Sequence, residues 1–316
     1  MKIAILDSGI DQDKVVRNRI NYIEGENWED NLGHGTLCYN VITNINKDAE
    51  IDIYKVLDKN GKSNSKVVCQ ALDDLIGSDV DIVNMSFSLT GEGKHIQELR
   101  RKCLKLKQEN KLLICSEQNN VATKSYPADW QEVMGVRGIN LEEEDKVLLH
   151  DKSNSIFFAS GIPVFSKIAK NGMCVFMGNS KATALTTGIM SIMDGRTVED
   201  YKGNCKGGEI ITDFDVYRKK EIMRNIEETE IFQVLYKEIS ASKEYEILKK
   251  KNFLLASAIT CNMNLANYYY KVIVMIEKII GKRIRLESVR MIDFMNLYTL
   301  AVSIRKRWEY FGQDEV

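Results

Sequence analysis

The chain begins Met1-Lys2-Ile3-Ala4-Ile5-Leu6-Asp7-Ser8-Gly9, an apolar run that ends in an acid and a glycine. Such a run predicts a buried strand followed by a tight turn. Two more glycine-marked segments come later, Gly33-His34-Gly35-Thr36 and Gly178-Asn179-Ser180-Lys181-Ala182-Thr183. An acid, a histidine and a serine in this chain order match one known arrangement of a Ser-His-Asp triad. The three segments therefore predict a single catalytic site that is assembled from distant parts of the chain.

The three residue types fit nucleophilic catalysis. A serine hydroxyl is a weak nucleophile near neutral pH, so Ser180 needs a base within hydrogen-bond reach. His34 can accept that proton, while Asp7 can hold the imidazole in the required tautomer and stabilise its charged form. Ordinary alternatives exist, because Asp7 could be only a turn residue and Ser180 only a helix N-cap. The order of the segments and their flanking residues favour the catalytic interpretation.

These segments resemble the subtilisin-like serine peptidases, the subtilases, over residues 1–200. Asp7-Ser8-Gly9 is similar to the family's acid motif, and Gly33-His34-Gly35-Thr36 to its histidine motif. Further similar segments follow in the family's order: Asn84-Met85-Ser86, Tyr126-Pro127-Ala128, Glu132-Val133-Met134-Gly135-Val136, Phe158-Ala159-Ser160-Gly161 and the Ser180 segment. The resemblance implies a serine endopeptidase with the catalytic residues Asp7, His34 and Ser180. We expect neither a metal nor another cofactor.

The resemblance also implies the surroundings of the triad. Asn119 is the expected oxyanion-hole donor, because its spacing to Tyr126-Pro127 fits better than that of Asn120. The expected substrate-binding residues are Ser86, Phe87, Ser88, Ser116, Glu117 and Gln118. Some positions depart from the family's pattern, and they bear on substrate preference and turnover more than on the triad. These are Ser88 in place of glycine, Glu117-Gln118 before Asn119, and Asn179 and Lys181 beside the nucleophile.

The order of apolar runs predicts the fold class. Five short runs read as buried parallel strands: Ile3–Leu6, Ile51–Val56, Val80–Met85, Leu112–Cys115 and Val133–Val136. Helical patterns lie between them, at Thr36–Ile45, Lys66–Leu75 and His95–Glu109. The alternation predicts an α/β fold with a parallel sheet and helices on both faces, as in subtilisin-like proteins, and a small C-terminal α-helical bundle beyond it. Catalytic groups should lie at strand ends and helix starts.

The 316 residues are enough for two domains. We expect a subtilisin-like catalytic domain over residues 1–213, including a linker from about residue 194, and an α-helical accessory domain over residues 214–316. The second part faintly resembles an acyl or peptidyl carrier protein. The turn that should carry the phosphopantetheine serine reads Leu265-Ala266-Asn267, without a serine. An unrelated helical bundle is the simpler alternative.

Composition limits the partners and the compartment. The charge is nearly balanced, with 44 Lys+Arg against 45 Asp+Glu, so no nucleic-acid partner is expected. No apolar run approaches the length of a membrane span, so no membrane partner is expected. The seven cysteines are an odd, unpaired set typical of a reducing cytoplasm. Because the first strand starts at once, we expect neither a signal peptide nor an N-terminal propeptide.

Two functions remain open. The first is a cytoplasmic serine endopeptidase that processes a specific peptide or precursor protein in a peptide-maturation pathway. The second is a peptide-binding protein with the subtilase fold and little or no turnover. A protein partner could also bind the C-terminal domain through Tyr268, Tyr269 and Tyr270 beside Lys271, Lys282, Arg283 and Arg285, although the tyrosines could simply pack the bundle. We also predict that His34 lies within reach of both Asp7 and Ser180, and that the Tyr126–Pro127 bond is cis.

Overall fold

The structure is a computed structural model that divides into two compact units. The first comprises Met1–Ile162 with Ser166–Ile210, and the second Pro163–Phe165 with Ile211–Val316. The residues it describes are 1–91, 93–118, 125–139, 147–149, 156–162, 164–169, 172–193, 230–241, 265–284, 300–301 and 303–304.

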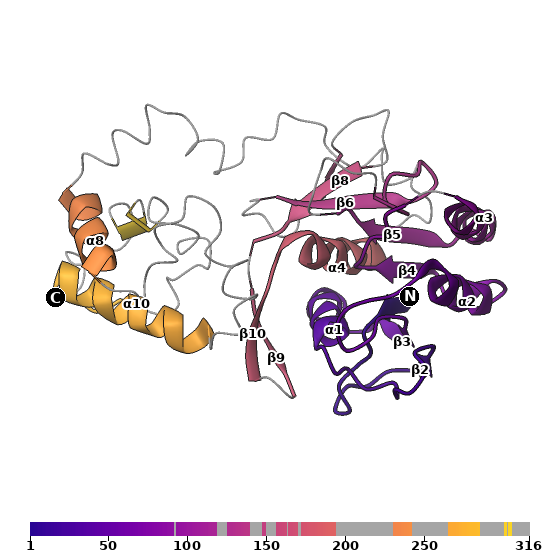
Figure 1. The fold of residues 1–316 in the computed structure, drawn as a ribbon, viewed down its shortest axis with the longest axis horizontal. Helices are drawn as coiled ribbons and strands as arrows, with labels where there is room; N and C mark the ends of the chain where they lie inside the picture. The colour runs from indigo at the N-terminus through magenta and orange to yellow at the C-terminus, as the bar shows by residue number, and fades with distance from the viewer. Residues whose placement is uncertain are drawn as a thin grey trace. The chain divides into compact units, whose positions relative to one another are not determined.

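A sheet of eight strands forms the centre of the first unit (Figure 1). Its order is β2-β3-β1-β4-β5-β6-β8-β7, and every pair is parallel except the edge pair β7–β8. The parallel sheet confirms the predicted fold class. The strands are β1 Lys2–Asp7, β2 Asn18–Asn21, β3 Glu50–Lys55, β4 Ile82–Met85, β5 Leu112–Ser116, β6 Met134–Ile139, β7 Val147–Leu149 and β8 Ile156–Ser160.

Helices cover both faces of this sheet, as the sequence predicts. The helices α2 (Ser65–Leu75) and α3 (Lys94–Gln108) pack on each other and share one core with Ala4 and Leu6 of β1. Ile3 and Ile5 are also fully buried, and they face the other side because side chains alternate along a strand. That side is covered by α1 (His34–Ile45) and α4 (Gly178–Ile192), which pack against each other.

The two helices α1 and α4 approach closely because the second carries a glycine at their contact. A Cβ atom at Gly188 would lie 2.9 Å from the Cβ atom of Ile45. This contact matters for the site, because α1 begins with His34 and α4 carries Ser180 in its first turn. The sequence prediction that Asp7 ends a strand and that the other two residues start helices is confirmed.

A separate two-stranded sheet joins β9 (Val164–Ile168) to β10 (Gly172–Phe176), directly before α4. Neither of its strands was among the five runs predicted from apolar patterns. Its residues contribute to the site, since the ring of Phe176 packs edge-on against the His34 ring with centroids 5.5 Å apart.

In the second unit the described residues include the helices α8 (Glu230–Ala241) and α10 (Leu265–Ile280), which contact each other. Both bury apolar side chains, among them Phe232, Leu235 and Ile276. The second helix ends directly before Gly281. The side chains of Tyr268, Tyr269 and Tyr270 lie outside the described residues. Within the described part of the chain, no helix combines the length and apolar character that crossing a membrane requires.

Candidate active site

The acid and the histidine of the predicted triad meet at one end of the sheet. Asp7 is the last residue of β1 and is fully buried, while His34 is the first residue of α1. The Nδ1 atom of His34 lies 2.8 Å from the Oδ1 atom of Asp7, so the two side chains are hydrogen-bonded. This half of the predicted geometry is confirmed. The pair has the arrangement in which a carboxylate fixes the tautomer of a neutral imidazole.

A buried carboxylate that sequence reasoning missed holds this region together. Asp30 accepts hydrogen bonds from the main-chain N–H groups of Leu32, Gly33 and Thr36 at 2.6–3.2 Å, and from the Thr36 hydroxyl. It also accepts one from the hydroxyl of Ser8, which follows Asp7. The side chain therefore joins the acid turn to the histidine turn. Its position four residues before His34 is the signal in the sequence that could have drawn attention to it.

Two glycines allow these turns to come so close. A Cβ atom at Gly35 would lie 2.3 Å from the main-chain oxygen of Gly9, so no larger residue fits between the acid and histidine turns. Gly33 has φ +92° at the N-cap of α1, a conformation that costs other residues free energy. These motifs therefore contain glycine because two backbone segments approach each other closely there.

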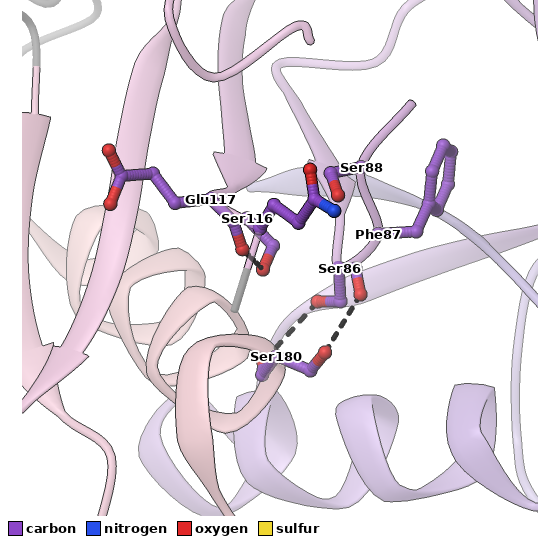
Figure 2. A pocket seen from close by; sticks show the side chains of 7 residues that line it. Ser86, Phe87, Ser88, Ser116, Glu117 and Ser180 are labelled. Carbon is purple, nitrogen blue, oxygen red and sulfur yellow. Dashed lines mark hydrogen bonds between the residues drawn. The ribbon is translucent and has the colours of Figure 1, made fainter. Parts of the chain in front are cut away.

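The nucleophile candidate lies at the start of α4 with a different hydrogen-bond partner. The Ser180 hydroxyl donates to the main-chain oxygen of Ser86 at 2.9 Å, and the Ser86 hydroxyl lies 3.4 Å from the main-chain oxygen of Ser180 (Figure 2). Among the described residues, no hydrogen bond joins Ser180 to His34. The predicted contact between base and nucleophile is therefore not formed in this structure, in which the serine is turned toward the end of β4.

The residues on either side of the nucleophile depart from the family's pattern, and the structure gives them clear positions. The Asn179 side chain accepts from the main-chain N–H of Gly138 at 2.8 Å and donates to the main-chain oxygen of Glu117 at 2.9 Å. It therefore ties the nucleophile turn to the ends of β5 and β6. Lys181 is 1% exposed, and its Nζ atom lies 3.5 Å from the Ser160 hydroxyl.

All six predicted substrate-binding residues come together around one pocket. A cavity of about 340 Å³ is lined by Ser86, Phe87, Ser88, Ser116, Glu117, Gln118 and Ser180. Figure 2 shows Ser88 on the opposite side of this pocket from Ser180, whereas the carboxylate of Glu117 points away from it. That carboxylate pairs with Arg137. Since the one acidic side chain of the lining is paired outside the pocket, the other lining side chains are uncharged: the serine hydroxyls, the Phe87 ring and the Gln118 amide.

The electrostatic surroundings of His34 favour its charged form. Burial acts to lower the pKa of the imidazole, but the charge of Asp7, the neighbouring Cys38 and the hydrogen bonds to both side chains together outweigh burial. The pKa is therefore raised well above the ordinary value of 6.5. A base of raised pKa accepts a proton readily, but it is available only at a pH high enough to leave it neutral.

A third group of metal-ligating type lies against this pair. The buried Sγ atom of Cys38 is 3.7 Å from Asp7 Oδ2 and 4.0 Å from His34 Nδ1. In the described part of the chain, these three residues are the one group of His, Cys, Asp and Glu side chains placed to hold a metal ion together. Burial, followed by the charge of Asp7, raises the pKa of the Cys38 thiol. The thiol is therefore no candidate nucleophile.

Two remaining predictions concern the segment after β5. Asn119, the expected oxyanion-hole donor, lies outside the described residues, and so does Asn120. The Tyr126–Pro127 peptide bond is cis, as predicted.

The comparison with family models agrees with this arrangement. The model described as the subtilase family matches residues 1–194, more than half of the chain. The chain belongs to the subtilase family. The matched residues contain both turns of the site and end just after α4.

Individual relatives are similar at a lower level. The minor extracellular protease Epr of Bacillus subtilis is 25% identical over 210 residues, which cover 62% of this chain and 32% of that protein. An intracellular serine protease of Paenibacillus polymyxa is 25% identical over 218 residues, covering 61% of this chain and 66% of the relative. The human membrane-bound transcription factor site-1 protease is 27% identical over 156 residues, which cover 45% of this chain and 15% of that protein. The chain thus spans between a seventh and two thirds of the length of these relatives.

Proposed function

We propose that this protein is a serine endopeptidase that hydrolyses peptide bonds with Asp7, His34 and Ser180. The observation that carries the proposal is the hydrogen bond of 2.8 Å between Asp7 and His34, next to a helix that presents Ser180 at its start. Membership of the subtilase family and the names of the protease relatives support the same reaction.

In the proposed reaction the Ser180 hydroxyl leaves the main-chain oxygen of Ser86 and turns toward the free Nε2 atom of His34. Catalytic hydrogen bonds are often loose in the absence of substrate and tighten when it binds. His34 then accepts the hydroxyl proton while the serine oxygen attacks the carbonyl carbon of the peptide, and later gives that proton to the leaving amine. Asp7 keeps the Nδ1 proton facing it throughout, so Nε2 is the atom that accepts and donates.

The negative oxygen that forms on the carbonyl needs donors. Ser180 lies in the first turn of α4, where main-chain N–H groups have no partners within the helix. The positive end of the helix dipole also favours a negative charge there. We propose the side chain of Asn119 as a further donor. A donor of this kind contributes about 3–4 kcal/mol to transition-state stabilisation.

The pocket beside Ser180 is the proposed binding site for the residue that precedes the scissile bond. Ser86, Phe87 and Ser88 form one wall, and Ser116, Glu117 and Gln118 form the other. The side chain of Ser88 lies across the pocket from Ser180. The one acid in the described lining, Glu117, is paired with Arg137 and is not available to hold a basic side chain. We therefore expect a preference for small or uncharged residues at this position of the substrate.

The wider setting is also part of the proposal. We propose that the substrate is a specific peptide or precursor protein, that the protein works in peptide maturation in the cytoplasm, and that its helical C-terminal part binds a protein partner or the substrate. The cysteines support a reducing compartment, because Cys38, Cys69, Cys103, Cys115 and Cys174 are all free thiols.

One observation favours a second function, a peptide-binding protein with little or no turnover. The Ser180 hydroxyl is engaged by Ser86 and not by His34, and Lys181 buries a cationic side chain directly after it. If this arrangement persists with peptide bound, the cleft binds peptides without cleaving them.

Labelling with a fluorophosphonate probe decides between the two functions. The probe reacts with a serine only when a neighbouring base activates it. We expect one label per chain on Ser180, found by mass spectrometry of the digested protein, and no label in Ser180→Ala. The matched control is Ser88→Ala, which alters a serine of the same pocket and should still be labelled. A folded wild-type protein that stays unlabelled while binding peptides supports the second function and contradicts the first.

A further inference from the structure

Three buried polar side chains join the middle of the nucleophile helix α4 to the end of the strand β4. Thr187 on α4 and Asn84 on β4 are fully buried, and Ser86, just after β4, is nearly so. Neither Thr187 nor Asn84 has a part in the proposed reaction. Burying a polar side chain costs free energy unless it is hydrogen-bonded, so apolar residues would fill these two places more cheaply. The contacts that these side chains make therefore call for an explanation.

The hydrogen bonds lead step by step toward Ser180. The Thr187 hydroxyl donates to Asn84 Oδ1 at 2.9 Å, and the main-chain oxygen of Thr183 is its second acceptor at 3.0 Å. The Nδ2 atom of Asn84 donates to the Ser86 hydroxyl oxygen at 3.0 Å. The Ser86 hydroxyl has two acceptors at 3.4 Å, the main-chain oxygen of Ser180 and Asn84 Oδ1. Because Asn84 Oδ1 already accepts from the helix, the last donor in the chain is directed at Ser180.

Ser86 and Ser180 hold each other by two contacts (Figure 2). The Ser180 hydroxyl donates to the main-chain oxygen of Ser86 at 2.9 Å, while the Ser86 hydroxyl faces the main-chain oxygen of Ser180. The second contact is made to the backbone of the nucleophile, so it can persist when the Ser180 side chain turns. It thus fixes the point about which the hydroxyl rotates toward His34.

The start of α4 needs such a contact on the side of β4. Asn179 ties the same turn to β5 and β6, and the main-chain N–H of Gly178 donates to the main-chain oxygen of Gly161 at 2.9 Å. These bonds lie toward one half of the sheet, whereas Asn84 lies on a strand that pairs directly with the strand of Asp7. The chain through Asn84 therefore sets the nucleophile relative to the strand that carries the acid.

We propose that Thr187 and Asn84 are positioning residues for Ser180, which act through the Ser86 hydroxyl and fix the main chain of the nucleophile at the end of β4. The catalytic role rests on the proposed function, whereas the chain of hydrogen bonds does not. A misplacement of about 1 Å at a reacting group can cost about 100-fold in rate. A residue two contacts away from the nucleophile can therefore change turnover without touching the substrate.

The first test is Thr187→Val, which removes the hydroxyl and keeps the shape of the side chain. The fluorophosphonate probe is used at increasing concentration, so that the maximal labelling rate is separated from the concentration that gives half of it. We expect the maximal rate to fall about 10-fold, because the nucleophile is less well placed, and the half-saturating concentration to stay unchanged. Thr187→Ser keeps the hydroxyl and should label at nearly the wild-type rate.

The matched control is Thr186→Val, on the same helix. Thr186 is also fully buried, but its hydroxyl donates to the main-chain oxygen of Ala182 at 2.8 Å, within its own helix. Each valine variant loses one buried hydroxyl, so thermal unfolding should show similar stabilities for the two. Only Thr187→Val should lose labelling rate. Equal maximal rates in the two valine variants would show that the Thr187 bond serves stability alone, and would overturn the proposal.

A double-mutant cycle tests whether Thr187 acts through Ser86. Ser86→Ala removes the hydroxyl and leaves the main-chain oxygen in place, so it breaks the last link of the chain. If the residues act as one chain, adding Thr187→Val to Ser86→Ala should slow labelling no further, since interacting positions are not additive. Rate losses that multiply contradict the proposal, as does a Ser86→Ala protein that is labelled as fast as the wild type.

Hydrogen exchange provides a readout that needs no catalysis. Main-chain N–H groups of residues 178–186 should exchange faster in Thr187→Val than in Thr186→Val, because the start of α4 opens more easily when its tie to β4 is cut. Equal exchange in the two variants shows that the chain does not hold the nucleophile turn. If the wild type is never labelled, the proposed function fails, while the exchange rates still decide whether Thr187 and Asn84 fix Ser180.

Discussion

The turn before α1 and the turn before α4 carry the two halves of the proposed site, and they are held in different ways. The first is fixed by buried side chains, with Asp30 accepting from both the acid turn and the histidine turn and Asp7 bonded to His34. In the second, Asn179 ties the backbone to neighbouring strands, but the Ser180 hydroxyl is bonded away from His34. The base is therefore preorganised in this structure, whereas the nucleophile has to turn before it can react.

This difference makes the two halves separable by mutation. Changes at the nucleophile should remove chemistry and leave the fold intact, because the Ser180 hydroxyl donates a single hydrogen bond, to the main-chain oxygen of Ser86. Changes in the first turn should affect both stability and the proton-accepting power of His34.

The largest effect is expected for Ser180→Ala. Loss of the nucleophile of a triad lowers turnover about 10⁶-fold, while the unfolding temperature should stay near that of the wild type. The measurement is kcat for a cleavable peptide together with thermal unfolding. Ser88→Ala is the matched control and should retain hydrolysis. Substantial hydrolysis by purified Ser180→Ala would show that the nucleophile lies elsewhere.

Asp7→Asn should lower kcat about 10⁴-fold, because the amide no longer holds the Nδ1 proton of His34 and the ring takes the wrong tautomer. The measurement is kcat with a peptide that shows unchanged binding. A loss much smaller than this, with the fold intact, would mean that the bond between Asp7 and His34 does not serve catalysis. Asp52→Asn, which alters another buried acid in the neighbouring strand, tests whether any buried charge loss has the same effect.

Asp30→Ala should reduce the free energy of unfolding by about 3 kcal/mol or more. It leaves several donors of the histidine turn without their acceptor, and each buried unpaired group costs about 1–3 kcal/mol. Denaturant unfolding measures this, with the exposed Asp13→Ala as control. If both variants unfold at the same denaturant concentration, Asp30 does not hold the two turns together.

The raised pKa of His34 predicts opposite trends of activity and stability with pH. Only the neutral ring accepts a proton, so kcat/KM should fall about 10-fold per pH unit below the His34 pKa, which lies above 6.5. A pKa that is higher in the folded protein than in the unfolded chain stabilises the fold. This stabilisation is complete at a pH below the pKa of the unfolded chain, and it is lost as the pH rises through the pKa of the folded protein. Profiles of kcat/KM and nuclear magnetic resonance titration of the ring should report the same pKa. An acidic limb centred below 6.5 contradicts the prediction.

The smallest effect concerns the contact between the two halves. Gly188→Ala places a Cβ atom 2.9 Å from that of Ile45, an overpacking that costs about 1–3 kcal/mol. Alanine recovers up to about 1 kcal/mol of helix propensity, so a net loss near 1 kcal/mol is expected. Because α1 carries His34 and α4 carries Ser180, kcat/KM should also fall. Ile192→Ala, an exposed change on the same helix, is the control. If Gly188→Ala instead raises the free energy of unfolding, α1 and α4 can move apart at no cost to accept the added methyl group, and the prediction is wrong.

Much of the molecule follows from local pattern. The apolar runs of β1, β3, β4, β5 and β6 and the helices α1, α2 and α3 lie within a few residues of their predicted places, because buried strands and amphipathic helices have distinct periods. The strands β2, β7, β8, β9 and β10 were not among the predicted runs. The sequence NRIN of β2 carries little apolar pattern, whereas β8 and β10 are short apolar segments whose pairing depends on the strands beside them.

The sequence alone determined the order of acid, histidine and serine, the sheet that carries them and the six residues around the pocket, because motif and strand order fix which ends of a parallel sheet meet. Only the tertiary structure decided that Asp30 joins two turns, that Cys38 lies against Asp7 and His34, and that Ser180 is bonded to Ser86. These contacts join residues on different turns, strands and helices, so their distances depend on how β1, α1 and α4 pack together. No local pattern encodes that packing.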